Sequence, residues 1–252
     1  MTADRFGEGG HDQEWRYNLS MKFFLATCVL LSVCSAQDKA ATQSAPTSVT
    51  VPAAIDHNRV VINAEVPLLN GASERVRAWV DNGNPDLYLS RRLATLLGLA
   101  VTCGDKECSA PPPPELRVGG MTIPLSGVKQ AKIPLKPVNA ASVLAPGMNV
   151  EITLPSSILR HYDVLIDFPG RKFSIGRPGT IVFRGPSGKV LVNAENGLIQ
   201  VPSQTENKKY NLALDIGASI SFLSEELFDK LASAHADWPH MTGAVGPANM
   251  WG

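Results

Sequence analysis

Alternation of apolar and polar positions begins near residue 60. Every second position is apolar over one stretch, namely Val60, Ile62, Ala64 and Val66. This period is typical of a β-strand with one buried face. A second apolar run follows and ends at Asp81, then a tight turn, a further apolar run that ends near Ser90, and an amphipathic stretch at 91–98. The predicted order is strand, turn, strand, helix.

The same order returns in the second half of the chain, around Asp215. When Asp215 is aligned with Asp81 no gap is needed, and these pairs also coincide: Gly217 with Gly83, Leu223 with Leu89, Ser224 with Ser90, Leu227 with Leu93, and Leu231 with Leu97. Ser90 and Ser224 precede the helical patterns and are predicted N-caps. A single Asp-x-Gly is a common turn. Two in register indicate one supersecondary unit used twice.

Composition narrows the class of protein. Hydrophobic residues make up 44% and charged residues 18%, which favours a globular chain over a disordered one. Lys plus Arg and Asp plus Glu balance at 23 each, so no net charge favours nucleic acid or an anionic membrane as a partner. The 21 glycines and 19 prolines suit many short strands and turns. We therefore expect a mostly β fold.

The start of the chain resembles an export signal. Residues 21–36 combine a Met-Lys start, a short apolar run and small residues ending at Ala36, which is typical of a secretory signal peptide. The run is shorter than the roughly 20 residues that span a bilayer. Residues 1–20 are interpreted as an upstream extension assigned to the gene in error, and 37–54 as a Ser/Thr/Ala/Pro linker. The prediction is an exported protein, periplasmic or extracellular.

The residues before Cys34 suggest a minor alternative. They are similar to a lipoprotein processing box, in which Cys34 would carry a lipid, and only then would a membrane be a partner. After cleavage at Ala36 only Cys103 and Cys108 remain, and a close pair in an exported chain predicts a disulfide. A two-cysteine metal site would need two more ligands, and no histidine is near in sequence. No metal is predicted.

The two Asp-x-Gly units resemble those of the pepsin and retropepsin aspartic proteases, in which an apolar strand leads into Asp-Thr/Ser-Gly. The stretch from Asp215 to Ser219 is the closer match, and Asp81-Asn82-Gly83-Asn84 the looser. Residues 158–176 are similar to the closing helix and hairpin of a retropepsin-like lobe. The resemblance implies two mostly β, barrel-like lobes at 55–177 and 180–252. It also places a flap or edge hairpin over the cleft at about 110–123.

Chemistry follows from the same resemblance. Asp81 and Asp215 would share one proton, activate a water and hydrolyse a peptide bond in a peptide or protein substrate, without cofactor or metal. The residues that would support the dyad are Asn82, Gly83, Ile216, Gly217, Ala218 and Ser219. The oligomeric state is not indicated by the sequence.

Two features depart from the family pattern. Asn82 and Ile216 stand where the family has Thr or Ser, whose hydroxyls join the two loops, and Ile216 has no group for that bond. The chain also stops much sooner after Asp215 than the first lobe continues after Asp81, so we expect an incomplete second lobe. Loosened loops leave open an alternative, a catalytically inactive relative that binds peptides in the same cleft.

Overall fold

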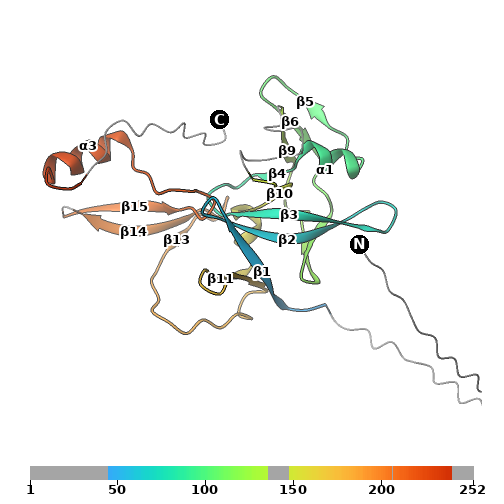
Figure 1. Ribbon diagram of the computed structural model, residues 1–252, viewed down its shortest axis with the longest axis horizontal. Coiled ribbons are helices and arrows are strands. Elements are labelled where there is room, and N and C mark those ends of the chain that lie inside the picture. The colour runs from blue at the N-terminus through green and yellow to red at the C-terminus, as the bar shows by residue number, and fades with distance from the viewer. Residues whose placement is uncertain (1–44, 136–147, 206, 240–252) are drawn as a thin grey trace, which may run out of the picture. The chain divides into compact units, whose positions relative to one another are not determined.

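The computed structural model describes residues 45–135, 148–205 and 207–239 (Figure 1). The predicted upstream extension at 1–20, the signal peptide at 21–36 and Cys34 lie outside these residues. Of the described residues, 43% are in strands and 11% in helices, which confirms the mostly β prediction. Several separate sheets are present, and in the described ranges none closes into a barrel, so the barrel expectation is not met.

The largest sheet has eight strands, with the order β10–β3–β2–β1–β12–β11, while β7 pairs with β2 and β8 with β7. Its strands are β1 (Ser48–Asp56), β2 (Arg59–Pro67), β3 (Ser73–Asp81), β7 (Glu115–Val118), β8 (Met121–Pro124), β10 (Ile152–Pro155), β11 (Asp163–Asp167) and β12 (Lys172–Gly176). The short helix α2 (Ser156–Leu159) directly follows β10. Helix α2 and the β11–β12 hairpin correspond to the closing helix and hairpin predicted at 158–176.

The start of β1 corrects the predicted linker. Residues Ser48 to Ala54 had the composition of a linker, yet they form most of β1, which pairs with β12 from Ser48 to Pro52 and with β2 from Ala53 to Asp56. The first folded unit therefore begins at Ser48 rather than at residue 55. Thr and Val at these positions are good strand formers once a partner strand is available.

Strand β3 brings Asp81 to the centre of the first unit. Its last residues, Ala78 to Asp81, are buried, because β2 and β10 flank the strand on both edges. The pairing with β10 is parallel and places Asp81 opposite Pro155. Because β3 ends there, the aspartate side chain emerges at a strand end, next to the start of α2.

A smaller sheet follows the first Asp loop. It has the order β4–β9–β6–β5 and contains β4 (Leu87–Tyr88), β5 (Thr102–Cys103), β6 (Glu107–Ala110) and β9 (Ala131–Pro134). Cys103 and Cys108 are opposite each other in the β5–β6 hairpin and form the predicted disulfide, with an S–S distance of 2.06 Å. Strand β4 directly follows the Asp81 loop, and the β5–β6 hairpin belongs to the same sheet as β4.

A hairpin, β7–β8, is present in the region predicted to hold a flap or edge hairpin, but it does not lie over the Asp81 loop. Gly119 and Gly120 form the β7–β8 turn with positive φ, and Gly119 lies against Val49 and Val51 of β1. Strand β7 pairs with β2 at Glu65, about 20 Å along the strand from Arg59 at a rise of about 3.3 Å per residue. The hairpin thus covers the end of β2 that is remote from the Asp81 loop.

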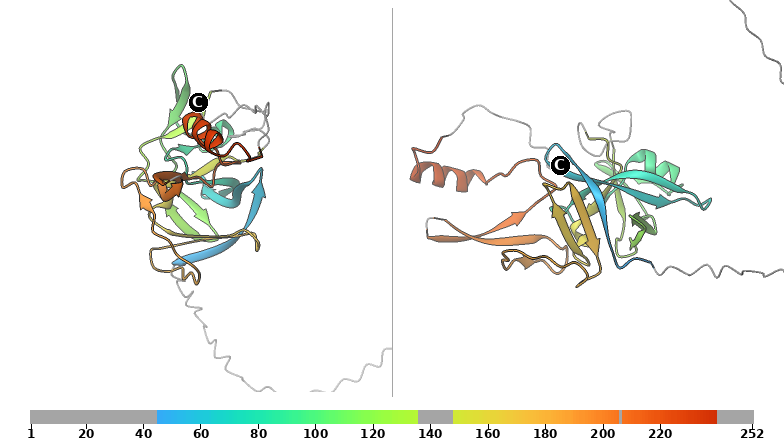
Figure 2. Two further views of the ribbon diagram at one scale, coloured as in Figure 1. Left: turned by 90° about the vertical axis from the view of Figure 1, so that its left-hand side faces the viewer. Right: turned by 60° about the horizontal axis from the view of Figure 1, so that its bottom comes forward.

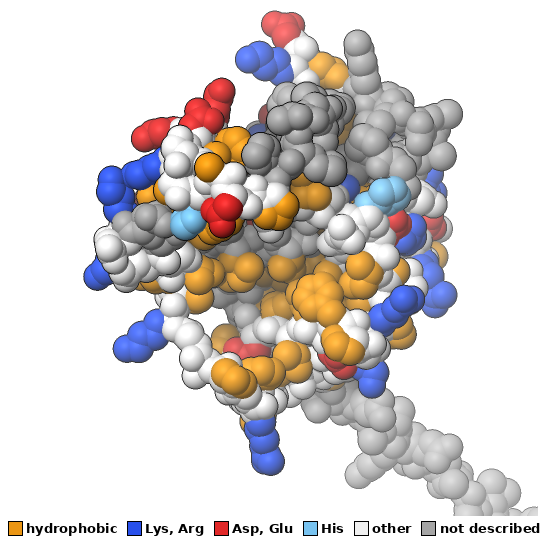
Figure 3. All heavy atoms as spheres, turned by 60° about the vertical axis from the view of Figure 1, so that its left-hand side comes forward, with side chains coloured by type: hydrophobic (Ala, Val, Ile, Leu, Met, Phe, Trp, Pro, Cys, Tyr) orange, Lys and Arg blue, Asp and Glu red, His pale blue; other side chains and the backbone are white. Residues whose placement is uncertain are grey.

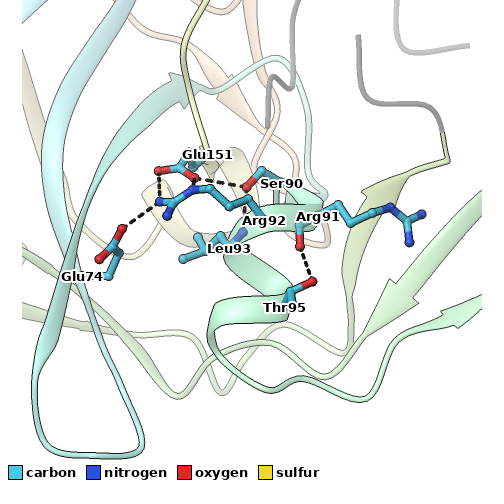
Figure 4. A network of polar contacts seen from close by, with 7 residues as sticks. All are labelled: Glu74, Ser90, Arg91, Arg92, Leu93, Thr95 and Glu151. Atoms are coloured by element: carbon cyan, nitrogen blue, oxygen red, sulfur yellow. Dashed lines mark hydrogen bonds and ion pairs between the residues drawn. The ribbon is translucent and has the colours of Figure 1, made fainter. Parts of the chain in front are cut away.

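Helix α1 (Arg91–Leu96) is attached to the main sheet by a polar network (Figure 4). Ser90 caps it as predicted, because its Oγ accepts the Leu93 N–H at 3.0 Å. Arg92 donates to both carboxylate oxygens of Glu151, at 2.6 and 2.7 Å, and to Glu74 at 2.8 Å. Glu151 is only 8% exposed, so these bonds satisfy a buried charge. They join α1 to the segment before β10 and to β3.

The second half forms a separate sheet, β13 (Leu191–Val192), β14 (Ile199–Thr205) and β15 (Lys208–Leu214), and helix α3 (Glu225–Ala234). The β14–β15 hairpin and α3 extend away from the main sheet in Figure 1 and in the right-hand view of Figure 2. Ser224 caps α3 through the Leu227 N–H at 3.3 Å, as predicted. The strand predicted between Asp215 and Ser224 is absent: these residues form turns, bends and chain without regular secondary structure.

Apolar side chains of this second half face solvent. No buried hydrophobic residue lies beyond Ile175 in the described ranges, and α3 has no buried residue. Figure 3 shows hydrophobic side chains gathered around a hollow on this face. The exposed large hydrophobic residues of the second half include Leu212, Leu214, Phe222, Leu223 and Phe228. The described part of the second unit therefore has no hydrophobic core of its own.

Candidate active site

The first Asp loop is fixed by its own backbone and by α2. Asp81 is 3% exposed, and the Gly83 N–H donates to its Oδ1 at 3.2 Å. The carbonyl of Asn84 accepts the Ser156 N–H at 3.0 Å and the Ser156 hydroxyl at 3.2 Å. Ser157 donates to the Pro85 carbonyl at 2.6 Å. These bonds hold the irregular Asn84-Pro85 segment in place.

The second Asp loop follows β15 in the same way. Asp215 is partly buried, and its Oδ1 accepts the Gly217 N–H at 2.8 Å and the Ala218 N–H at 3.0 Å. Two backbone donors on one carboxylate oxygen stabilise a negative charge there. The Asp81 carboxylate also has backbone donors, Gly83 at 3.2 Å and Asn84, but it is more deeply buried than Asp215, so the two aspartates differ in environment.

The two carboxylates face each other across the loops. A Cβ added to Gly83 would overlap the Asp215 carboxylate, and a Cβ added to Gly217 would overlap that of Asp81. The same added Cβ at Gly217 would also lie 3.1 Å from Asp215 Oδ1. One small space is therefore bordered by oxygens of both aspartates. Each glycine is needed for this close approach, because any side chain there would push the opposite carboxylate away.

Asn82 joins the loops. Its Nδ2 donates to the Leu214 carbonyl at 2.8 Å and its Oδ1 accepts the Ile216 N–H at 2.7 Å. Ile216 makes no side-chain hydrogen bond, as expected, but it packs against the core of the first unit. The expected loosening at these two positions is thus offset, because one asparagine makes both polar contacts and the isoleucine adds an apolar one.

A second connection comes from the β1–β2 turn, and sequence reasoning did not find it. His57 and Asn58 both have positive φ, the conformation of a two-residue hairpin turn. From this turn Asn58 donates to the Ser219 carbonyl at 3.0 Å, and Arg59 Nε donates to the Gly217 carbonyl at 2.8 Å. The asparagine was a local signal for the turn. Nothing local indicated contacts with residues so distant in sequence.

The electrostatic environment favours a proton on Asp81. Burial, and after it the nearby charge of Asp215, raise the pKa of the Asp81 carboxyl to about 7. The Gly83 N–H and the positive charge of Arg59 act in the opposite direction. The net result is a carboxyl group that keeps its proton up to near-neutral pH.

The described residues contain neither a metal-binding cluster nor a membrane-spanning helix. Within those ranges there is no group of three or more His, Cys, Asp or Glu side chains placed to hold a metal ion. No helix in the same part of the chain is long and apolar enough to cross a membrane. His57 lies on the surface and contacts Asp56, while His235 stacks on Trp238.

No protein-family model matches the chain, and no curated protein matches its sequence. Among solved structures the chain is similar to the aspartic proteinase from Irpex lacteus, with 12% sequence identity and a TM-score of 0.42. The match covers 75% of this chain and 68% of the proteinase chain. The case for a function rests on the two aspartate loops themselves.

Proposed function

We propose that the protein is an aspartic endopeptidase that hydrolyses peptide bonds with a water activated between Asp81 and Asp215. One observation carries this proposal: each carboxylate packs on the glycine of the opposite loop, so both border one space. Two carboxylates that border one space cannot both ionise easily, and one proton is shared between them. This is the protonation state that the reaction needs.

The two environments support different roles for the aspartates. Asp215, whose Oδ1 accepts two backbone N–H groups, takes a proton from the water as the water oxygen attacks the peptide carbonyl carbon. Asp81, with its raised pKa, carries the shared proton and donates a hydrogen bond to the carbonyl oxygen. The tetrahedral intermediate then breaks at its C–N bond as the leaving nitrogen takes the proton that Asp215 removed from the water, and a hydroxyl of the intermediate returns the shared proton to Asp81 as the acid product forms. Neither a metal nor a covalent intermediate is required.

The test is cleavage of an unfolded protein from acidic to neutral pH, with products identified by mass spectrometry. We expect cleavage by the wild type, its inhibition by a pepstatin-type compound, and its loss in both Asp81→Asn and Asp215→Asn. Asp229→Asn, an exposed aspartate on α3, is the matched control and should retain activity. Activity that survives in Asp215→Asn would reject the mechanism. Binding of the peptide without cleavage by the wild type would instead indicate an inactive peptide-binding relative.

We also infer that the protein is exported. The Cys103–Cys108 disulfide is compatible with an oxidising compartment, where such bonds persist. Expression of the full chain in a bacterial host, followed by cell fractionation and N-terminal sequencing, tests this. We expect a mature chain outside the cytoplasm that begins at Gln37. A chain that keeps residues 21–36 and stays in the cytoplasm would contradict export, and a lipid on Cys34 would indicate the lipoprotein alternative.

A further inference from the structure

Arg59, the first residue of β2, makes contacts on both sides of the junction between the two halves. Its Nε donates to the Gly217 carbonyl at 2.8 Å, and its Nη1 contacts Met148 Sδ at 3.3 Å. The guanidinium lies over the Trp79 ring, 5.0 Å from the centroid. Trp79 is a buried residue of β3, so the arginine stands on a rigid platform only two positions before Asp81.

The Gly217 carbonyl and the Ala218 N–H belong to one peptide group, which is planar and trans. In a trans peptide these two groups point in opposite directions. Arg59 binds the carbonyl on one side, and on the other side the Ala218 N–H donates to Asp215 Oδ1 at 3.0 Å. A charged donor on the carbonyl also polarises the peptide group and strengthens its N–H as a donor.

We propose that Arg59 is a positioning residue for the dyad: it holds the Gly217–Ala218 peptide so that its N–H is aimed at the Asp215 carboxylate. This inference rests on the proposed aspartic-peptidase function. Arg59 touches neither the reacting atoms nor the carboxylates at hydrogen-bond distance in the described part of the chain. It acts on Asp215 through the intervening peptide group.

The charge of Arg59 has a second effect on the site. Asp56, which is opposite Arg59 in the β1–β2 pair, contacts Arg77 at 3.1 Å and His57 at 2.7 Å instead. No described carboxylate forms a salt bridge with Arg59. The charged groups that act on Asp81 are Asp215 from the second loop and Arg59 from the start of β2. Arg59 therefore offsets part of the negative charge of the dyad as well as orienting one of its donors.

Three substitutions separate the two effects. Arg59→Gln places a side-chain N–H at the position of Nε but removes the charge. Arg59→Met has a similar length and removes both the donor and the charge. Arg59→Lys keeps the charge and removes the donor at the Nε position. Arg75→Met is the matched control, because Arg75 is an exposed arginine of β3.

Two readouts are measured on the full chain: the NMR shift of the Ala218 amide proton, and the apparent pKa values of the dyad from the carboxyl carbons of labelled aspartate. With Arg59→Met we expect an upfield shift of the amide proton, because its hydrogen bond weakens. We also expect a rise of roughly 0.5 to 1 in the higher pKa of the pair. Arg59→Gln should raise that pKa and leave the chemical shift of the Ala218 amide proton unchanged. Arg59→Lys should leave the pKa unchanged and move the amide proton upfield. Arg75→Met should change neither.

Kinetics adds a third readout. We expect kcat to fall about 10-fold or more in Arg59→Met, with a smaller change in KM, because misplaced catalytic groups are costly. An unchanged amide shift and unchanged pKa values in the Gln and Lys variants would overturn the inference, even if Arg59→Met does not fold. If the wild type has no peptidase activity, the proposed function is rejected but the role of Arg59 is not. The NMR readouts do not depend on activity, so they still decide whether Arg59 positions the loop.

Discussion

The side-chain oxygen of Asn82 lies 2.7 Å from the backbone nitrogen of Ile216, so the residue after the first aspartate binds the residue after the second. The same side chain donates to Leu214, on the other side of Asp215. One amide thus contacts the second loop before and after its aspartate. Because an amide has both a donor and an acceptor, a single asparagine makes both bonds without a hydroxyl partner on the opposite loop.

Replacement of Asn82 by alanine removes both of these bonds. Asn82 is buried, so the Ile216 N–H and the Leu214 carbonyl lose partners, and we expect the free energy of unfolding to fall by about 1–3 kcal/mol. Peptidase activity should fall at least about 10-fold, because the Asp215 loop then keeps only its connection to Asn58 and Arg59. Urea denaturation and initial rates measure the two effects. Asn70→Ala, in an exposed turn where Asn70 accepts the Ala72 N–H, should leave activity unchanged.

The raised pKa of Asp81 predicts how stability depends on pH. Between about pH 4 and 7 the folded state binds a proton that the unfolded state has lost, because the pKa is 3.8 in the unfolded chain and about 7 in the folded one. The contribution of Asp81 to stability therefore falls as pH rises through this window, by at most about 1.4 kcal/mol per pH unit, and levels off above pH 7.

Urea denaturation of wild type and Asp81→Asn at several pH values measures this dependence. The variant has no proton to lose at this position, so the difference in unfolding free energy between variant and wild type should change from pH 4 to 7. Activity of the wild type should decline as pH rises through about 7, when the shared proton leaves the dyad. A constant difference across that range would show that Asp81 titrates near its ordinary pKa.

Local patterns in the sequence were enough for a large part of the fold and the site. The repeated strand, turn and helix, both serine caps and the close cysteine pair each depend on residues near one another in the chain. The contacts of Arg59 and Asn82 with the second loop could not be predicted in this way, because each joins residues that only the tertiary fold brings together.

One prediction from the repeat, the strand after Asp215, was wrong. In the first unit, β4 forms because it pairs in parallel with β9. The matching residues after Asp215 have similar apolar character, but no described strand pairs with them, and they have no regular secondary structure. Strand formation depends on a partner strand more than on intrinsic propensity. The aligned pattern therefore predicted a strand that this part of the structure does not contain.

The network around Glu151 predicts a stability effect away from the dyad. Arg92→Met leaves the buried Glu151 carboxylate without its two bonds from Arg92, shown in Figure 4. Arg92 itself is about half exposed, so solvent screening reduces the loss, and we expect about 1–3 kcal/mol. Arg117→Met, which removes an exposed pair with Glu115, should cost less than about 1 kcal/mol. Urea denaturation at neutral pH compares the two variants. Equal effects would mean that Glu151 is more accessible to water than its burial indicates.

The closest test of the facing carboxylates uses the loop glycines. Gly83→Ala puts a methyl group where the Asp215 carboxylate lies, and Gly217→Ala does the same to Asp81. Neither glycine has a positive φ, so the effect is one of space rather than of backbone conformation. We expect each variant to fold with a loss of about 1–3 kcal/mol and to lose activity about 100-fold, because the carboxylates are forced apart.

Gly127→Ala is the control for these two variants, because a methyl group there meets no atom within 4 Å and the glycine lacks a positive φ. It should fold with unchanged or slightly higher stability, through the lower entropy of its unfolded chain, and keep full activity. Thermal unfolding and initial rates, measured on all three variants, separate loss of fold from loss of the dyad. Full activity in both Gly83→Ala and Gly217→Ala would mean that Asp81 and Asp215 do not share one space during the reaction, whatever the stability data show.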